Sequence, residues 1–254
     1  MLSIAVINRA ARGDRWATLT RRFTAAGLGD IERFLAVEPA VCAGAPTTVS
    51  DHREPSPAGI ACALSHLQVW ERALARPAQP AIVVCEDDAM PTPELARLPP
   101  PVRERVLAAA PADADLILLG CTPLLRARAR RFSPLRLTRK LAMPGRSEFR
   151  RVYYFNGTWA YLVNRRGIEQ LLPRLRPVRH FDHQISELLA ASPEVFRAYE
   201  LLPAWFHHDY QSPSDVDCPA EPAADAALLA ALRAAQGALH RRHGIRTEIP
   251  PECV

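Results

Sequence analysis

The chain has no long apolar segment, and this absence limits how it can relate to a membrane. Of its 254 residues 48% are hydrophobic, yet no run approaches the roughly 20 apolar residues that a spanning helix needs. The first apolar run is interrupted by Asn8 and Arg9 after only a few residues, which excludes a signal peptide of the usual kind. We therefore expect a cytoplasmic protein, folded as one α/β domain or as one domain with a tail.

The cysteines form no Cys-x-x-Cys pair, and several sit within apolar runs as small core residues. This scatter argues against a zinc site and against a disulfide framework. We expect six free thiols, at Cys42, Cys62, Cys85, Cys121, Cys218 and Cys253.

Lysine is almost absent, because Lys140 is the only one in the chain. Nearly all positive charge is arginine, in a sequence also rich in alanine and proline, and a GC-rich genome is the simplest reason. The segment Arg126–Arg151 is different, because it holds ten basic residues and one acid, Glu148. A long basic loop of this kind suits an acidic or phosphorylated binding partner; the alternative is a solvated loop shaped by codon usage. Interleaved aromatic residues are missing, so we expect no nucleic-acid partner.

Three consecutive acids follow a short apolar run. Ala81–Cys85 has the length and composition of a strand buried on both faces, and Glu86, Asp87 and Asp88 come directly after it. Ligands of open α/β sheets bind at this end of the strands. Adjacent carboxylates repel one another unless a cation lies among them, and oxygen ligands suit Mg²⁺ or Mn²⁺, which in turn hold the phosphates of a nucleotide. The alternative is a polar turn after a strand.

Strands and helices alternate along the chain, which predicts an α/β sheet flanked by helices. Ser56 followed by Pro57 predicts a capped helix start, and residues 91–101, rich in proline, predict a loop within the domain. We expect strands at Ser3–Asn8, Ala81–Cys85, Asp115–Gly120, Val152–Phe155, Ala160–Val163 and Phe196–Leu202. We expect helices at Arg15–Ala26, from Ser56 on, at Arg165–Leu172, at His183–Ala191 and, as a C-terminal helix, at Ala223–His243.

The acidic triplet occurs together with other motifs in a specific order. Upstream lies Gly59-Ile-Ala-Cys-Ala-Leu-Ser-His66, and the amino terminus carries Ile4-Ala-Val-Ile-Asn-Arg with Arg15 beyond it. Downstream come Asn156-Gly-Thr-Trp-Ala-Tyr-Leu-Val163 and Asp182. In this order and spacing the chain resembles the family 25 glycosyltransferases, which include lipooligosaccharide and collagen galactosyltransferases. The resemblance runs from about residue 3 to about residue 215.

The resemblance implies a GT-A-like (Rossmann-like), mostly parallel sheet in a domain of residues 1–220, with residues 221–254 as a helical tail packed on it. It implies a metal-dependent, inverting transfer of galactose or glucose from a UDP-sugar, with Mn²⁺ or Mg²⁺, to an anionic glycan or glycolipid. Such an acceptor would bring the protein into peripheral contact with the inner membrane. The implied metal ligands are Asp87, Asp88, His207 and His208, although paired histidines are not a fixed feature of the family.

The remaining implied site residues each have a structural alternative. Asp182 is the expected base, or else a helix N-cap. Trp159 could stack on a sugar, although a buried tryptophan is the commoner case. The resemblance gives donor-binding roles to Asn8, Arg15, Ser65, His66, Glu86, Asp87, Asn156, Gly157 and Thr158. The alternatives are capping and a surface ion pair for Asn8 and Arg15, a core helix histidine for His66, and an ordinary hairpin turn for Asn156–Thr158.

Two other functions use the same features. A metal-dependent phosphohydrolase could use the acidic triplet with no sugar acceptor, and a non-catalytic binding module for anionic glycans could rely on the basic segment alone. The sequence does not fix the sugar, the acceptor or the oligomeric state.

Overall fold

The computed structural model describes residues 3–42, 56–127, 148–175, 180–209 and 245–247. These residues form a seven-stranded sheet in the order β2-β1-β3-β6-β7-β5-β9, with additional pairing of β6 to β5 and a separate β4–β8 ladder. The strands are β1 (Ile4–Asn8), β2 (Ile31–Leu35), β3 (Ala81–Glu86), β4 (Ala89–Pro91), β5 (Leu116–Ala127), β6 (Glu148–Asn164), β7 (Ala198–Leu202), β8 (Phe206–His208) and β9 (Ile245–Thr247).

The sheet is mostly parallel. The β1–β2, β1–β3 and β5–β7 pairs are parallel, whereas β6 runs antiparallel to β3, β5 and β7. The helices are α1 (Gly13–Ala25), α2 (Pro57–Leu74), α3 (Pro93–Arg97), α4 (Pro100–Ala108), α6 (Arg165–Leu171) and α7 (Phe181–Ala191), with a 3-10 turn, η1, at Pro39–Cys42. The expected α/β class with a mostly parallel sheet is confirmed.

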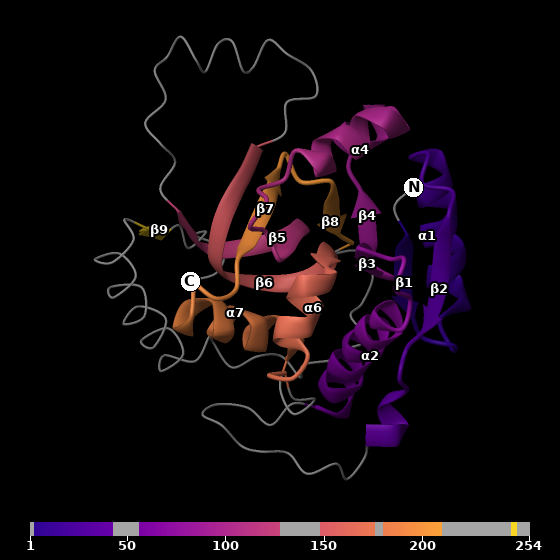
Figure 1. Ribbon diagram of the computed structural model, residues 1–254. Helices are drawn as coiled ribbons and strands as arrows, with labels where there is room; N and C mark the ends of the chain where they lie inside the picture. Colours follow the sequence, from indigo (N-terminus) through magenta and orange to yellow (C-terminus); the bar gives the residue numbers. More distant parts are fainter. Residues whose placement is uncertain (1–2, 43–55, 128–147, 176–179, 210–244, 248–254) are drawn as a thin grey trace.

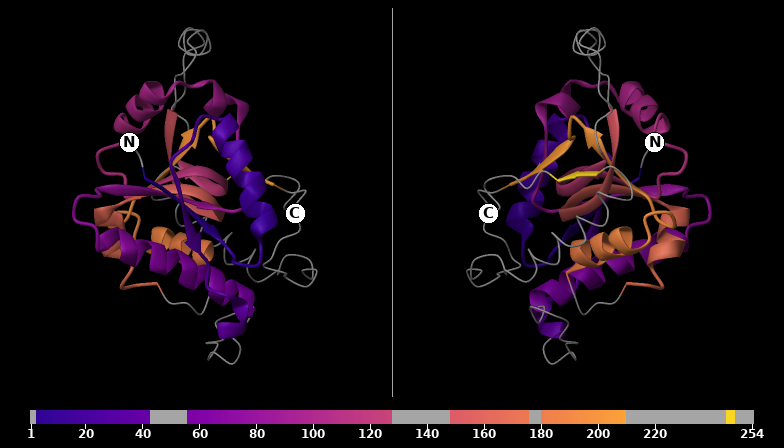
Figure 2. Two further views of the ribbon diagram at one scale, coloured as in Figure 1. Left: turned by 90° about the vertical axis from the view of Figure 1, so that its right-hand side faces the viewer. Right: turned by 90° about the vertical axis from the view of Figure 1, so that its left-hand side faces the viewer.

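Helices cover both faces of the sheet (Figures 1 and 2). Alternate residues of the central strands point to opposite faces, so Ile82 and Val84 pack with α2, α6 and α7, whereas Val83 and Cys85 pack with α1, α3 and α4. Burial on both faces explains the continuous apolar run of β3.

Local signals place two of the helices. Ser56 accepts a hydrogen bond from Gly59 N at 3.1 Å, and Pro57 occupies the first turn of α2, as predicted. Gly27 follows the end of α1 in the left-handed region, at φ 67°, where only glycine is unstrained. Both ends agree with the sequence prediction, although α1 begins two residues early, at Gly13.

Two sequence expectations are wrong. Residues 91–101 are not a loop, because they contain α3 and the start of α4; each of these helices has a proline in its first turn, a position that favours proline. Asn156–Thr158 is not a hairpin turn, because β6 runs through it. Gly157 has φ 79°, and between the pairs Gly120↔Ala160 and Thr122↔Asn156 the β5–β6 register shifts, so a bulge absorbs the extra residues. The strand β2 was not predicted.

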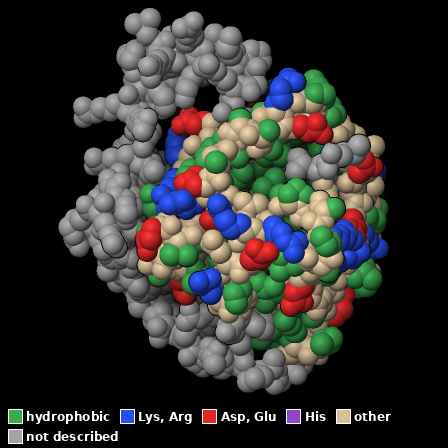
Figure 3. Space-filling model, in the orientation of Figure 1, with side chains coloured by type: hydrophobic (Ala, Val, Ile, Leu, Met, Phe, Trp, Pro, Cys, Tyr) green, Lys and Arg blue, Asp and Glu red, His purple; other side chains and the backbone are tan. Residues whose placement is uncertain are grey.

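Several predictions concern residues that the structure does not describe. The helix expected at Ala223–His243 and most of the Arg126–Arg151 segment lie outside the described residues, and β5 and β6 border that segment at Ala127 and Glu148. On the face shown in Figure 3, arginine side chains lie among carboxylates and do not gather in one patch. Among the ion pairs of the described residues, Arg165 pairs with Glu169 and Arg166 with Asp115. Within the described residues no helix is both long and apolar enough to cross a membrane.

Candidate active site

A cleft of about 430 Å³ opens where β1 and β3 end, beside the middle of β6 and the amino ends of α2 and α7. Its position at the carboxyl ends of parallel strands agrees with the sequence prediction. Ten of the predicted site residues line it: Arg15, Ser65, His66, Glu86, Asp87, Asp88, Gly157, Thr158, Asp182 and His208.

Asp87 is held by two side chains from the first βα unit. Its Oδ2 accepts a hydrogen bond from Asn8 Nδ2 at 2.7 Å, and its Oδ1 forms a 2.8 Å ion pair with Arg15 Nη1. Both partners of the ion pair are nearly buried, with side chains 6% and 10% exposed. Burial raises the pKa of Asp87, and the bonds from Asn8 and Arg15 oppose that rise. Asn8 therefore acts on the cleft through Asp87 and does not line it.

Asp88 lies beside His208, with 3.2 Å between Asp88 Oδ2 and His208 Nε2. The β4–β8 ladder brings them together, because Ala89 pairs with His208 and Asp209 N donates to Asp88 O at 2.9 Å. The hydrogen bond with Asp88 raises the pKa of His208 against the effect of burial. The second oxygen, Asp88 Oδ1, is buried and has no hydrogen-bond partner among the described residues.

The free oxygen of Asp88 fits a role in metal binding. A carboxylate oxygen and an imidazole nitrogen are ligands that Mn²⁺ accepts, and Mg²⁺ sites of nucleotide enzymes use one or two carboxylates plus substrate phosphates. Both oxygens of Asp87 are already engaged, so Asp88 Oδ1 is the carboxylate oxygen that could hold such an ion, with His208 beside it. Mg²⁺ or Mn²⁺ would complete its shell with donor oxygens and water.

His66 is fully buried beneath the cleft and is fixed from several sides. Its Nδ1 lies 2.9 Å from Tyr161 Oη, which also accepts a hydrogen bond from Trp70 Nε1 at 3.0 Å. Its ring stacks on Phe181 at 4.3 Å between centroids. His66 Nε2 has no hydrogen-bond partner among the described residues and lies 3.5 Å from Glu86 Oε1. His66 is therefore packed as a core histidine, as the structural alternative expected. Its Nε2 could still bind a ligand in the cleft.

The other residues of the acidic strand end and of α2 have structural partners. Glu86 Oε1 accepts a hydrogen bond from Thr158 Oγ1 at 2.8 Å. Ser65 Oγ donates to Ala61 O at 2.7 Å and accepts from Val37 N at 2.9 Å. Ser65 thus anchors the segment after β2 to α2, and this contact shapes one wall of the cleft.

Asp182 is the second residue of α7 and does not occupy the N-cap position, which His180 takes. Its Oδ2 accepts from Gly157 N at 2.7 Å and its Oδ1 from His183 N at 2.9 Å. These bonds fix the carboxylate on the cleft wall and tie α7 to the bulge of β6. Each oxygen keeps a second lone pair for a substrate hydroxyl.

Besides Asn8, two predicted residues do not line the cleft. His207 is exposed and pairs with Met90, so it points away from the side of the β4–β8 ladder that carries His208. Asn156 does not line the cleft either. The sequence analysis gave no role to Arg9 or Phe181, which do line it; Phe181 follows an apolar helical pattern and carries no chemical signal of its own.

The comparisons with solved structures show distant likenesses. A glycosyltransferase involved in glycosylation of the major capsid of PBCV-1 is 11% identical, with a TM-score of 0.41 over 84% of this chain and 95% of that one. The galactosyltransferase LgtC, in complex with donor and acceptor sugar analogs, is 14% identical, with a TM-score of 0.37 over 99% and 98%. The inositol-1-phosphate CTP transferase from T. maritima is 9% identical, with a TM-score of 0.45 over 86% and 92%. No curated protein matches the sequence.

One family model matches the chain. Residues 1–102 match glycosyltransferase family 25, described as an LPS biosynthesis protein. The match contains Asn8, Arg15, the Ser65-His66 pair and the acidic triplet, so the predicted resemblance is confirmed for this part of the chain. The likeness to family 25 glycosyltransferases therefore covers residues 1–102 of the 254-residue chain.

Proposed function

We propose that this protein is a glycosyltransferase that moves a hexose, galactose or glucose, from a UDP-sugar to an anionic bacterial surface glycan such as a lipooligosaccharide core. The reaction would need Mn²⁺ or Mg²⁺ and would invert the configuration at the sugar. The observation that carries the proposal is that one cleft holds both Asp88, with a free oxygen beside His208, and Asp182, fixed at the start of α7.

On the donor side, Asp88 and His208 would hold the divalent ion, which when bound supplies positive charge to the departing diphosphate. Asp87 keeps the end of β3 in place through Asn8 and Arg15. The side chain of Arg15 thereby balances negative charge close to the cleft. This arrangement favours a nucleotide diphosphate over a neutral ligand.

On the acceptor side, Asp182 would take the proton of the attacking hydroxyl. Its two backbone hydrogen bonds fix its orientation, which a general base needs before substrate arrives. With a single displacement, an α-linked donor gives a β-glycoside. The segment Arg126–Arg151 would bind an acidic acceptor at the cytoplasmic face of the inner membrane.

The experiment that tests the proposal is a donor panel. The protein is incubated with Mn²⁺ and a set of nucleotide sugars, with and without lipooligosaccharide acceptors, and sugar transfer and donor hydrolysis are both measured. Donor hydrolysis that no acceptor changes would favour the phosphohydrolase alternative.

Two variants separate the donor and acceptor sides. Asp88→Asn should remove nearly all turnover while the protein stays folded, and full activity of this variant, or of the wild type in EDTA, would contradict the metal role. Asp182→Asn should lower kcat by about 100-fold or more with donor affinity little changed. If it instead melts earlier but turns over normally, Asp182 is only a tether between α7 and β6.

A further inference from the structure

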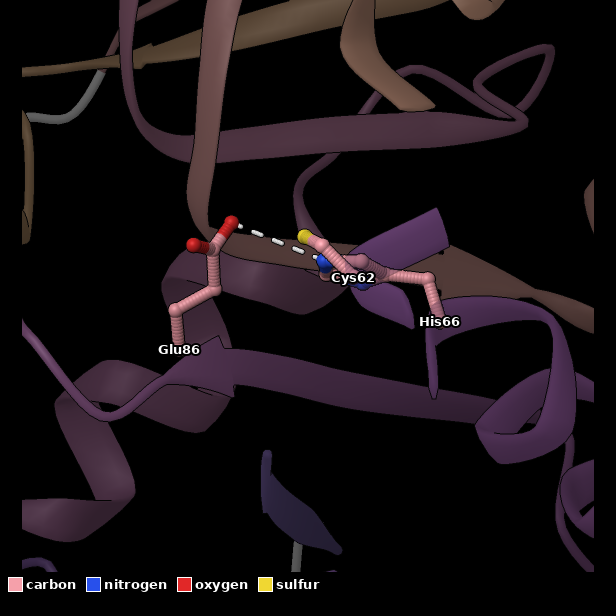
Figure 4. Close-up of side chains that lie close together, drawn as sticks. All are labelled: Cys62, His66 and Glu86. Atoms are coloured by element: carbon pink, nitrogen blue, oxygen red, sulfur yellow. Dashed lines mark ion pairs between the residues drawn. The ribbon is translucent and has the colours of Figure 1, made fainter. Parts of the chain in front are cut away.

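A second group of metal-ligating side chains lies in the cleft. Cys62, His66 and Glu86 each offer one ligand atom, and these atoms all lie within 4.8 Å of one another. In Figure 4 the Glu86 carboxylate faces the ring nitrogen of His66, and the Cys62 sulfur lies beside the dashed line that joins them. Among the described residues, this is the one group of three potential metal ligands. It shares no residue with the Asp88–His208 pair.

We infer that Cys62 Sγ, His66 Nε2 and Glu86 Oε1 form a binding site for a thiophilic divalent cation, with Zn²⁺ as the best-fitting ion. Sulfur, imidazole nitrogen and carboxylate oxygen are the ligand types of zinc, whereas Mg²⁺ prefers oxygen alone. Three protein ligands leave a fourth position, and Cys62 and Glu86 line the open cleft that would supply it.

The spacing of the ligands is close to what zinc needs. In a tetrahedral site with bonds of about 2.0–2.3 Å, ligand atoms stand roughly 3.3–3.8 Å apart. Since the ligand atoms now lie within 4.8 Å of one another, the group has to close by roughly 1.5 Å at most. Cys62 and His66 are four residues apart on α2, so they share one helix face, and Glu86 at the end of β3 faces them. The sequence argument against a zinc site considered only Cys-x-x-Cys pairs. It could not detect this group, because Glu86 comes from a strand distant in sequence from Cys62 and His66.

Two further observations point to a ligand at this place. His66 is 0% exposed, yet its Nε2 has no hydrogen-bond partner among the described residues and is aimed at Glu86. The ligands are also oriented from outside, because Tyr161 Oη contacts His66 Nδ1 and Thr158 Oγ1 donates to Glu86. Such supporting contacts fix the ring and carboxylate of bound-metal sites.

Binding is a proton exchange. The Cys62 thiol loses its proton to solvent as its sulfur bonds the cation, and His66 keeps its proton on Nδ1, where Tyr161 Oη can accept it together with the Trp70 N–H. No atom is oxidised or reduced. Because the site lies within the proposed substrate cleft, a bound zinc ion would exclude substrate from the space beside Glu86. Zinc would therefore inhibit transfer.

The test uses Co²⁺ as a spectroscopic substitute for zinc on the full-length, reduced protein, in excess Mg²⁺ so that oxygen-rich sites are filled. We expect one equivalent of Co²⁺ to give a thiolate-to-cobalt charge-transfer band, and one equivalent of Zn²⁺ to remove it. Cys62→Ser should abolish the band, and Glu86→Gln should weaken binding by about 10-fold or more. Cys121→Ser, a matched loss of another thiol, and Asp88→Asn should both keep the band.

No band in the wild type, or a band that persists in Cys62→Ser, would overturn the site. Circular dichroism spectra and melting curves of each variant show whether it is folded, and Glu86→Gln provides a second route if Cys62→Ser is not. This binding test does not depend on the proposed reaction. In the transfer assay, the rate of each protein with zinc is compared with its own rate without zinc. Zinc should inhibit the wild type and should not inhibit Cys62→Ser. Equal inhibition of both proteins would overturn the link between this site and transfer.

Discussion

The buried ion pair between Arg15 and Asp87 allows a quantitative test of how the cleft is supported. Removing one charge of the pair should lower the free energy of unfolding more than removing both charges. Asp87→Asn leaves a buried guanidinium without its carboxylate, and Arg15→Met leaves a carboxylate whose remaining side-chain hydrogen bond comes from Asn8. The double variant removes both charges together.

The magnitude follows from the burial of the pair. Breaking a buried ion pair from one side costs about 3–5 kcal/mol, whereas replacing both partners is often close to neutral. With side chains 6% and 10% exposed, the Arg15–Asp87 pair belongs to the buried class. We expect each single variant to lower the free energy of unfolding by about 3 kcal/mol and the double variant to lose much less than their sum. For a domain of this size the single variants should melt roughly 6–12 °C earlier.

Urea denaturation of the four proteins measures the coupling energy directly. A coupling of about 2 kcal/mol or more is expected, because the two groups touch. Single variants that each lose under about 1 kcal/mol, or losses that add within about 0.5 kcal/mol, would refute the view that Asp87 is held by this pair. In that case Asp87 would be free to act as a metal ligand in its own right.

Three further substitutions test how the cleft walls are built. Gly157→Ala should destabilise the protein by about 2 kcal/mol or more, because φ is 79° and the new Cβ would strike the Trp159 ring; thermal melting measures the loss. Ser65→Ala should cost about 1–3 kcal/mol in urea denaturation, because it leaves Val37 N without its acceptor. Tyr161→Phe should cost a similar amount and shift the ring signals of the histidine beneath the cleft in NMR spectra, because the phenol oxygen joins two buried nitrogen groups.

Matched controls separate these effects from general damage. Gly29→Ala adds the same methyl group where nothing lies within 4 Å of the new Cβ, so it should change the free energy of unfolding by less than about 1 kcal/mol. A melting temperature of Gly157→Ala equal to that of Gly29→Ala would contradict the proposed bulge geometry. Unchanged stability of Ser65→Ala would mean that the segment after β2 needs no anchor.

The parts of the fold that were predicted correctly depend on neighbours in the sequence. Ser56 and Pro57 mark the start of α2 through contacts within one turn. The apolar run Ala81–Cys85, followed by acids, marks a strand buried on both faces and the point at which it leaves the core. In these cases local chemistry and tertiary packing favour the same structure.

The incorrect predictions depend on contacts that are distant in the sequence. Asn156-Gly157 favours a turn locally, but its backbone instead continues as β6, because Gly157 N binds the Asp182 carboxylate 25 residues away. Pro93 and Pro100 favour a loop when only the local sequence is considered, but proline also begins helices, as it does in α3 and α4. The residues of β2 are only partly buried, so the sequence shows no clear apolar pattern that would predict this strand.

The site shows the same division. The acidic triplet was identified correctly as a feature of the cleft, yet the sequence could not assign its members to different tasks. Asp87 pairs with Arg15, whereas Asp88 keeps a free oxygen, and this difference arises from which strand and helix each side chain meets. Likewise, only the strand pairing of β8 shows that His208 faces the cleft and His207 does not.

The antiparallel strand β6 connects the parts of the cleft. Gly157 binds Asp182, Thr158 binds Glu86, and Tyr161 meets His66, while the Trp159 ring lies 5.7 Å from that of His208. Because side chains alternate along a strand, a shift of β6 by one residue would turn Thr158 and Tyr161 away from their partners at once. The bulge at Gly157 lets consecutive residues contact both Asp182 and the acidic end of β3. The register of β6 therefore sets the geometry of the whole cleft, although none of its own residues carries a charge there.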